Sequence, residues 1–193
     1  MNLNLPNKLT VIRMVLIPFF MAGMLLSQYL ERDTDGIDIY VLVSLVIFII
    51  ASVTDWLDGT IARKRGLITT FGKFLDPLAD KMLVMSALIL FTARPGDQWI
   101  DAAAVIVILA REFMVSAIRL VVANEGIVVA AGIWGKLKTA FTMIAIVAVM
   151  FLEGIGVHIF WLNEILIWIA AVLTVVSGVQ YLSAYWDKID SNK

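Results

Sequence analysis

The chain has 193 residues, of which 61% are hydrophobic and only 16% are charged. Soluble domains are about 45–50% apolar and about 25% charged, so this composition excludes a disordered chain and nearly every soluble globular domain. The 15 basic and 16 acidic residues give a net charge of −1, which does not favour nucleic acid as a partner. The absence of cysteine excludes disulfides, cysteine-bound zinc and a cysteine nucleophile. We expect one membrane domain over residues 1–193.

Several segments of the chain reach the roughly 20 apolar residues that a membrane-spanning helix needs. We expect six spans, at about residues 9–28, 39–63, 71–93, 99–123, 136–152 and 159–186. Pro18 predicts a kink in the first span, and the fairly apolar link 124–135 is expected to lie in the interface. The first segment is interpreted as a span rather than a signal peptide, because no cleavage site of small residues is evident. The sequence therefore predicts an all-α integral membrane protein with six transmembrane helices.

An even number of spans places both termini on one side of the membrane, and the charged residues test this arrangement. Most basic residues fall at or near that side: Lys8, Arg13, Arg63, Lys64, Arg65, Lys73, Lys81, Arg119, Lys136, Lys138, Lys188 and Lys193. The opposite loops hold only Arg32 and Arg94 and are otherwise acidic. The positive-inside rule then predicts cytoplasmic termini and a cytoplasmic 63–73 loop, in a protein of the bacterial cytoplasmic membrane.

Four aspartates around the 63–73 loop are the strongest chemical signal in the sequence. Asp55 and Asp58 have i,i+3 spacing at the end of the second span, and Asp76 and Asp80 have i,i+4 spacing at the start of the third. Each carboxylate would cost about 2.5–3.5 kcal/mol at mid-membrane and less near the interface. Oxygen ligands of this kind suit Mg²⁺, Mn²⁺ or Ca²⁺, and two such ions would neutralise the site. A two-metal site is typical of phosphoryl transfer.

Two other interpretations of these aspartates remain open. Asp76 precedes Pro77 and is compatible with an N-cap at the start of a helix. Acids within a membrane also mark cation or proton transport pathways, although transport sites usually lie near the midplane. Small residues beside the carboxylates favour a binding site, because they leave room for a flat ligand such as a nucleotide base: Gly59, Ala62 and Gly72.

The pattern Asp55-x2-Asp58-Gly59-x2-Ala62-Arg63-x8-Gly72-x3-Asp76-x3-Asp80 resembles the signature of the CDP-alcohol phosphotransferases, without departure. The resemblance implies the family's fold and a reaction that transfers a phosphatidyl or similar group from a CDP-linked donor to an alcohol and releases CMP. It implies a homodimer that requires Mg²⁺ or Mn²⁺. The implied metal ligands are Asp55, Asp58, Asp76 and Asp80, with Asp80 also the general base. The implied nucleotide and donor residues are Gly59, Ala62, Arg63, Gly72, Asn7, Thr10 and Arg13.

The remaining charges bear on the acceptor. Basic residues of the fourth and fifth spans predict a pocket for a phosphorylated alcohol, and they are Arg111, Arg119, Lys136 and Lys138. The lysines are also compatible with lipid headgroup contacts, and Arg111 with a neutralising pair to Glu112.

Two segments of this region, 110–119 and 135–139, resemble those of the CDP-diacylglycerol–glycerol-3-phosphate 3-phosphatidyltransferases. That resemblance implies CDP-diacylglycerol as the donor and sn-glycerol 3-phosphate as the acceptor. Inositol phosphate is the nearest alternative acceptor, and a cation or proton transporter is the alternative of a different class.

Overall fold

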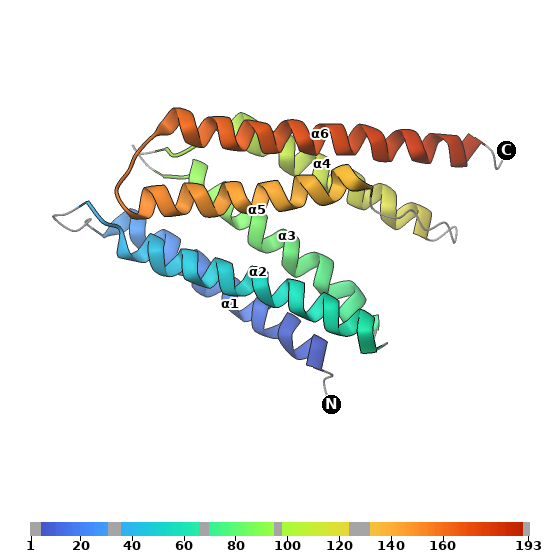
Figure 1. Ribbon diagram of the computed structural model, residues 1–193, viewed down its shortest axis with the longest axis horizontal. Helices are drawn as coiled ribbons and strands as arrows, with labels where there is room; N and C mark the ends of the chain where they lie inside the picture. The colour runs from blue at the N-terminus through green and yellow to red at the C-terminus, as the bar shows by residue number, and fades with distance from the viewer. Residues whose placement is uncertain (1–4, 31–35, 66–69, 95–97, 124–131, 191–193) are drawn as a thin grey trace. The chain divides into compact units, whose positions relative to one another are not determined.

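The computed structural model describes residues 5–30, 36–65, 70–94, 98–123 and 132–190 (Figure 1). Within these ranges, the side chains at 5–8, 55–65, 70–77, 80, 120–123, 184 and 187–190 lie outside the described part. The described residues form six α-helices and no strand. The helices are α1 Leu5–Tyr29, α2 Ile39–Arg65, α3 Thr70–Thr92, α4 Ala102–Ala123, α5 Ile133–Gly154 and α6 Phe160–Asp190. The all-α prediction is confirmed.

Each of the six apolar segments corresponds to one helix, but several predicted ends were wrong. α4 begins at Ala102 rather than at residue 99, because the Asp101 carboxylate accepts the backbone N–H of Ala103 at 3.3 Å and caps the helix. Trp99 and Ile100 precede α4 and are nonetheless buried. α5 begins three residues earlier than expected, at Ile133, so the end of the 124–135 link is already helical.

Among the described residues, three helices are apolar enough over a sufficient length to cross a membrane: α1 over Leu9–Tyr29, α5 over Ile133–Gly154 and α6 over Phe160–Ser183. α2 and α3 contain the shorter apolar stretches Ile39–Thr54 and Lys81–Thr92. Large apolar side chains are exposed on these helices, including Phe19 on α1, Ile144 on α5 and Val179 on α6. Exposed apolar surface of this extent fits a lipid environment.

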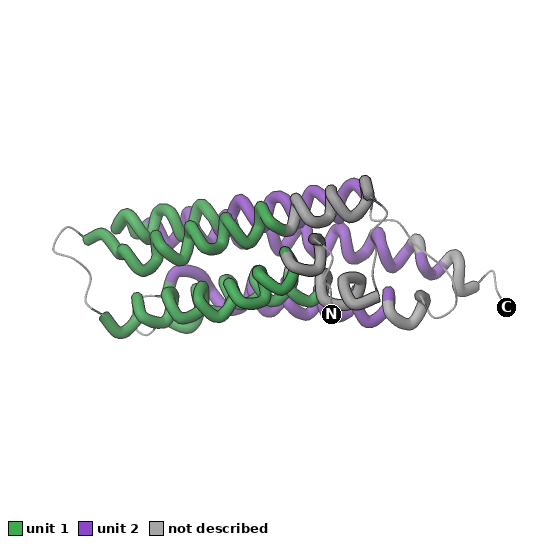
Figure 2. Tube along the Cα trace, turned by 90° about the horizontal axis from the view of Figure 1, so that it is seen from below, with its two compact units in different colours: residues 1–98, 147–158 green, residues 99–146, 159–193 purple. Residues whose placement is uncertain are grey.

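The chain divides into two compact units, which Figure 2 distinguishes by colour. The first unit comprises residues 1–98 and 147–158, and the second comprises residues 99–146 and 159–193. In the first unit α1 packs against α2 and α3. Ile17, Phe20 and Met24 lie on the packed face of α1, and Phe20 meets Phe48 of α2 with ring centroids 5.8 Å apart. In a lipid environment such contacts stabilise the helix pair through van der Waals packing rather than through removal of apolar surface from water.

Four helix ends meet at one end of the first unit. Asp38 caps α2, because its Oδ1 accepts the backbone N–H of Val41 at 3.1 Å. The Asp38 backbone N–H bonds the Gly154 carbonyl at the end of α5 at 2.9 Å. Its other carboxylate oxygen accepts the Ser27 hydroxyl of α1 at 2.5 Å and lies 3.7 Å from Nη2 of Arg94, just after α3. We call Ser27, Asp38 and Arg94 the helix-end cluster.

The end of α5 is closed by a glycine that the backbone requires. Gly156 has φ of +77°, a conformation that costs other residues energy. The N–H of Val157 reaches the Leu152 carbonyl at 2.9 Å, and that of Gly156 reaches the Glu153 carbonyl at 3.2 Å. This pair of bonds is a Schellman motif, which satisfies carbonyls that the helix leaves open.

In the second unit α4 packs against α6, and the two helices run in the same direction. The Glu164 carboxylate near the start of α6 accepts the Asp101 backbone N–H at the start of α4. Further along, Val115 of α4 packs with Tyr181 and Tyr185 of α6. A parallel α4–α6 pair agrees with a chain that reverses direction at each successive helix.

Candidate active site

The acidic motif lies at the connected ends of α2 and α3. Asp55 and Asp58 fall within the last three or so turns of α2, and Asp76 and Asp80 fall within the first three or so turns of α3. α2 and α3 contact one another, and only residues 66–69 separate them in the chain. Both acidic pairs therefore belong to the same end of the first unit. Their side chains lie outside the described residues, so their mutual geometry stays a prediction.

The structure excludes one alternative interpretation of the motif. α3 begins at Thr70, so Asp76 and Pro77 lie inside the helix rather than at its start. The N-cap interpretation of Asp76 is therefore wrong. An aspartate in the interior of an apolar helix has no capping role and needs another explanation, such as ligand binding.

The donor set of the motif fits a hard divalent cation. Among the side chains that the structure describes, no three histidines or carboxylates gather in a way that could hold a metal. The acidic motif combines oxygen donors at i,i+3 and i,i+4 spacing on two contacting helices. Carboxylate oxygens of this kind are the ligands that Mg²⁺ and Mn²⁺ prefer.

The N-terminal residues expected near the donor headgroup belong to the packed face of α1. Thr10 and Arg13 are both buried, and Arg13 is 0% exposed. They continue, at helical spacing, the stripe formed by Ile17, Phe20 and Met24. A fully buried arginine in a predominantly apolar helix is costly and favours a functional role. The side chain of Asn7 lies outside the described residues.

The second unit brings two of the four predicted acceptor residues together. Nη1 of Arg111 donates to Oε1 of Glu112 at 2.8 Å, and the same oxygen accepts Nζ of Lys138 from α5. Nη2 of Arg111 donates to the Ser177 hydroxyl of α6 at 2.5 Å. We call Arg111, Glu112, Lys138 and Ser177 the mid-helix cluster. The neutralising Arg111–Glu112 pair foreseen from the sequence therefore forms, but Glu112 is shared between two cations.

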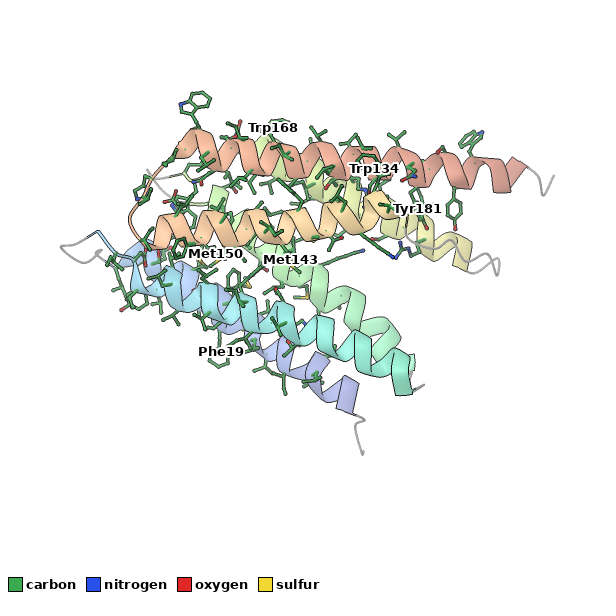
Figure 3. The ribbon with its side chains drawn as sticks, viewed as in Figure 1. Phe19, Trp134, Met143, Met150, Trp168 and Tyr181 are labelled. Carbon is green, nitrogen blue, oxygen red and sulfur yellow. The ribbon has the colours of Figure 1, made fainter. Side chains whose placement is uncertain are left out.

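The other two predicted acceptor residues lie on more exposed surface. Arg119 is exposed, and its guanidinium carbon lies 5.6 Å from the ring centroid of Tyr181, a residue of α6 that Figure 3 labels. This is a cation–π contact. Lys136 is exposed at the start of α5, one turn from Thr139 and two residues before Lys138.

Sequence reasoning missed the contribution of α6. Ser177, Gly178 and Tyr181 contact Arg111 or Arg119, yet none was selected from the sequence. One signal was available, because Thr174, Ser177, Tyr181 and Tyr185 repeat at three- and four-residue spacing and all four are buried. A polar stripe along an apolar helix indicates a face turned toward protein rather than lipid.

Comparison with known proteins extends these observations over the whole chain. The family model described as CDP-alcohol phosphatidyltransferase matches residues 3–176. A Bacillus subtilis (strain 168) protein named CDP-diacylglycerol–glycerol-3-phosphate 3-phosphatidyltransferase is 45% identical over 98% of both chains. Proteins of the same name from Haemophilus influenzae and Rickettsia bellii are 40% and 38% identical over 94% of this chain and 93% and 94% of their own. The chain therefore belongs to the CDP-alcohol phosphatidyltransferase family.

Proposed function

We propose that this integral membrane protein transfers the phosphatidyl group of CDP-diacylglycerol to sn-glycerol 3-phosphate, giving phosphatidylglycerophosphate and CMP. The observation that carries the proposal is the 45% identity, over 98% of both chains, to a relative named for this reaction. The acidic motif is complete in the sequence, with no signature residue replaced. The basic residues of the second unit suit an acceptor that carries a phosphate.

The acidic motif holds the metal in this proposal. Asp55, Asp58, Asp76 and Asp80 are the ligands, and two Mg²⁺ or Mn²⁺ ions match their four charges. When bound, such ions offset negative charge on the phosphoryl oxygens and on the departing CMP. Asp80 takes the proton of the acceptor hydroxyl as that hydroxyl attacks the lipid-side phosphorus.

The donor is held by residues on both sides of the acidic motif. Gly59, Ala62 and Gly72 leave space for the cytidine, because small side chains let a flat base approach the helix backbone. Arg63 supports the phosphate or the carboxylate cluster. Asn7, Thr10 and Arg13 contribute near the donor headgroup, and the burial of Thr10 and Arg13 supports a role inside the protein rather than at its surface.

The acceptor phosphate is bound by Arg111, Arg119, Lys136 and Lys138. Guanidinium groups bind phosphate through two parallel hydrogen bonds, and lysines add point charges. Arg111 and Lys138 bring two positive charges to one place, where both contact the Glu112 carboxylate.

We place the site on the cytoplasmic side of a single domain with six spans and cytoplasmic termini. The distribution of basic residues supports this topology. Soluble glycerol phosphate then arrives from the cytoplasm, while the acyl chains of the donor remain in the bilayer. As in the family, the working form is a homodimer.

The test is CMP release by detergent-purified protein supplied with CDP-diacylglycerol and Mg²⁺ or Mn²⁺. Glycerol 3-phosphate is compared with inositol 1-phosphate, serine and phosphatidylglycerol. We expect release with glycerol 3-phosphate alone, and loss of release after metal removal with EDTA. Asp80→Asn should lower the rate by about 10²–10⁴-fold, because it removes the general base. Asp35→Asn, outside the motif, is the matched control.

Any other outcome of this assay points to one of the alternative functions or acceptors. Release with another alcohol keeps the reaction class and overturns the interpretation of the basic residues. Absence of release with every acceptor, from folded protein, rejects the enzyme. Cation or proton flux in sealed vesicles without a nucleotide lipid would then support the transporter.

A further inference from the structure

We infer that α6 completes the acceptor-phosphate subsite, with Ser177 and Gly178 as positioning residues that set the orientation of the Arg111 guanidinium. The inference rests on the proposed function for the identity of the acceptor. Both residues follow position 176, where the match to the family model ends. They contribute no charge of their own, and they act through Arg111.

Ser177 fixes one end of the guanidinium. Its hydroxyl oxygen accepts a hydrogen bond from Nη2 of Arg111 at 2.5 Å, while Nη1 donates a hydrogen bond to Glu112 at 2.8 Å. Ser177 lies on α6 and Glu112 on α4, so the two bonds hold the planar group from two different helices. A rotation of the plane would break at least one bond to a charged group. The guanidinium is therefore pre-organised before any ligand arrives.

Gly178 provides the space in which the Arg111 side chain lies. A Cβ built at Gly178 would be 3.0 Å from Cγ and 3.1 Å from Nε of Arg111, closer than nine in ten real Cβ contacts. Glycine inside a helix costs about 1 kcal/mol relative to alanine. The close approach of Arg111 gives a reason for glycine at this position, because an added Cβ would require the arginine side chain to shift by a few tenths of an ångström.

The cluster also leaves binding capacity unused. Nε of Arg111 is buried and makes no hydrogen bond within the described part of the chain. Nε and an adjacent Nη form one of the two edges with which a guanidinium binds phosphate. The Arg111 residue is 9% exposed, which makes an unbonded donor costly unless a ligand completes it. An acceptor phosphate is the ligand whose chemistry fits this edge.

Steady-state kinetics test the positioning role in the full-length protein. Ser177→Ala removes the hydrogen-bond partner of Arg111 Nη2, and Gly178→Ala shifts the Arg111 side chain. We expect KM for glycerol 3-phosphate to rise about tenfold in each, as for a weakened hydrogen bond to a charged group, with KM for CDP-diacylglycerol within about twofold. Ser177→Thr keeps a hydroxyl and should restore much of the affinity.

Two matched controls make the same chemical changes away from Arg111. Ser183→Ala removes a hydroxyl of α6 that bonds the Gln180 carbonyl. Gly132→Ala adds a methyl that would meet only the end of the Gln180 side chain, at 3.3 Å. Both should leave both KM values unchanged. A purely structural role of Ser177 or Gly178 would instead lower the melting temperature and alter both KM values together, which would overturn the inference.

A binding measurement separates this inference from the proposed reaction. Glycerol 3-phosphate and inorganic phosphate should each raise the melting temperature of the wild-type protein, and the rise should be reduced in Ser177→Ala and Gly178→Ala. If wild type releases no CMP but shows this pattern, the proposed reaction fails and the anion subsite stands. If wild type releases CMP and both variants keep the full stabilisation, α6 does not position Arg111. Absence of stabilisation in wild type rejects the subsite.

Discussion

Each of the two units contains an ion cluster, and the clusters differ in their numbers of cations and acids and in the backbone groups that they bond. The helix-end cluster pairs one arginine with one aspartate, Arg94 with Asp38, and Ser27 joins them. In the mid-helix cluster two cations, Arg111 and Lys138, share the carboxylate of Glu112. The charges of the named residues therefore sum to zero in the first cluster and to +1 in the second.

The two clusters also differ in whether they bond backbone groups. Asp38 and Arg94 also bond backbone groups at the helix ends, since Asp38 caps α2 and Arg94 reaches the Ser27 carbonyl at 3.4 Å. The mid-helix cluster lies where the backbone groups are already paired within helices, so its side chains bond one another instead. A neutral cluster that closes helix ends is expected to stabilise the fold. A cluster of two cations around one shared carboxylate, placed away from helix ends, is expected to bind an anion.

The largest expected effect is on stability, from Asp38→Asn. The change leaves Arg94 buried without its acid, which should lower the free energy of unfolding by about 3–5 kcal/mol. Denaturation in detergent measures this loss, and KM for glycerol 3-phosphate should not change. Asp101→Asn is the matched control, because Asp101 also caps a helix but faces solvent, and asparagine caps equally well. Similar losses in both variants would show that removing an aspartate charge at the start of any helix, rather than breaking the buried ion pair, explains the effect.

A smaller effect is expected from Ser27→Ala. The Ser27 hydroxyl donates to Asp38 and accepts Nη2 of Arg94 at 2.8 Å, so its removal leaves two charged groups with one partner fewer. We expect a loss of about 1–2 kcal/mol. Ser44→Ala provides the comparison, because that buried hydroxyl bonds the Tyr40 carbonyl of its own helix, at 2.7 Å, and no charged group among the described residues. An equal loss in the two variants would contradict the role assigned to the helix-end cluster.

The smallest effect is expected beside the mid-helix cluster, from Tyr181→Phe. The Tyr181 hydroxyl is buried and makes no hydrogen bond to the described residues, while its ring lies under Arg119. Phenylalanine keeps the ring, so the melting temperature and KM for glycerol 3-phosphate should stay unchanged. Tyr181→Leu removes the cation–π contact, worth about 0.5–1 kcal/mol, and also the packing of the ring against Tyr185, so its cost should exceed that value. A large loss in Tyr181→Phe would mean that the hydroxyl itself is used, for example by a ligand.

The helices and the acidic motif were predictable because both are local properties. Runs of about 20 apolar residues predicted all six helices, and i,i+3 and i,i+4 spacing placed Asp55 with Asp58 and Asp76 with Asp80 on α2 and α3. The start of α4 was wrong because Trp99 and Ile100 are apolar but lie before the Asp101 cap. A hydrophobic run does not distinguish a buried loop residue from a helical one.

The sequence by itself determined the helical architecture, the family and the residue types of the candidate site, because these depend on neighbours within a few turns. Only the tertiary structure decided which charges meet. Arg111 and Ser177 are 66 residues apart in the chain, and Arg94 and Ser27 are 67 apart. Such contacts depend on which helices pack together and on the face that each turns toward its neighbour, so hydrophobic periodicity alone does not specify them. The role of Gly178 likewise depends on tertiary structure, because Arg111 of another helix packs against it.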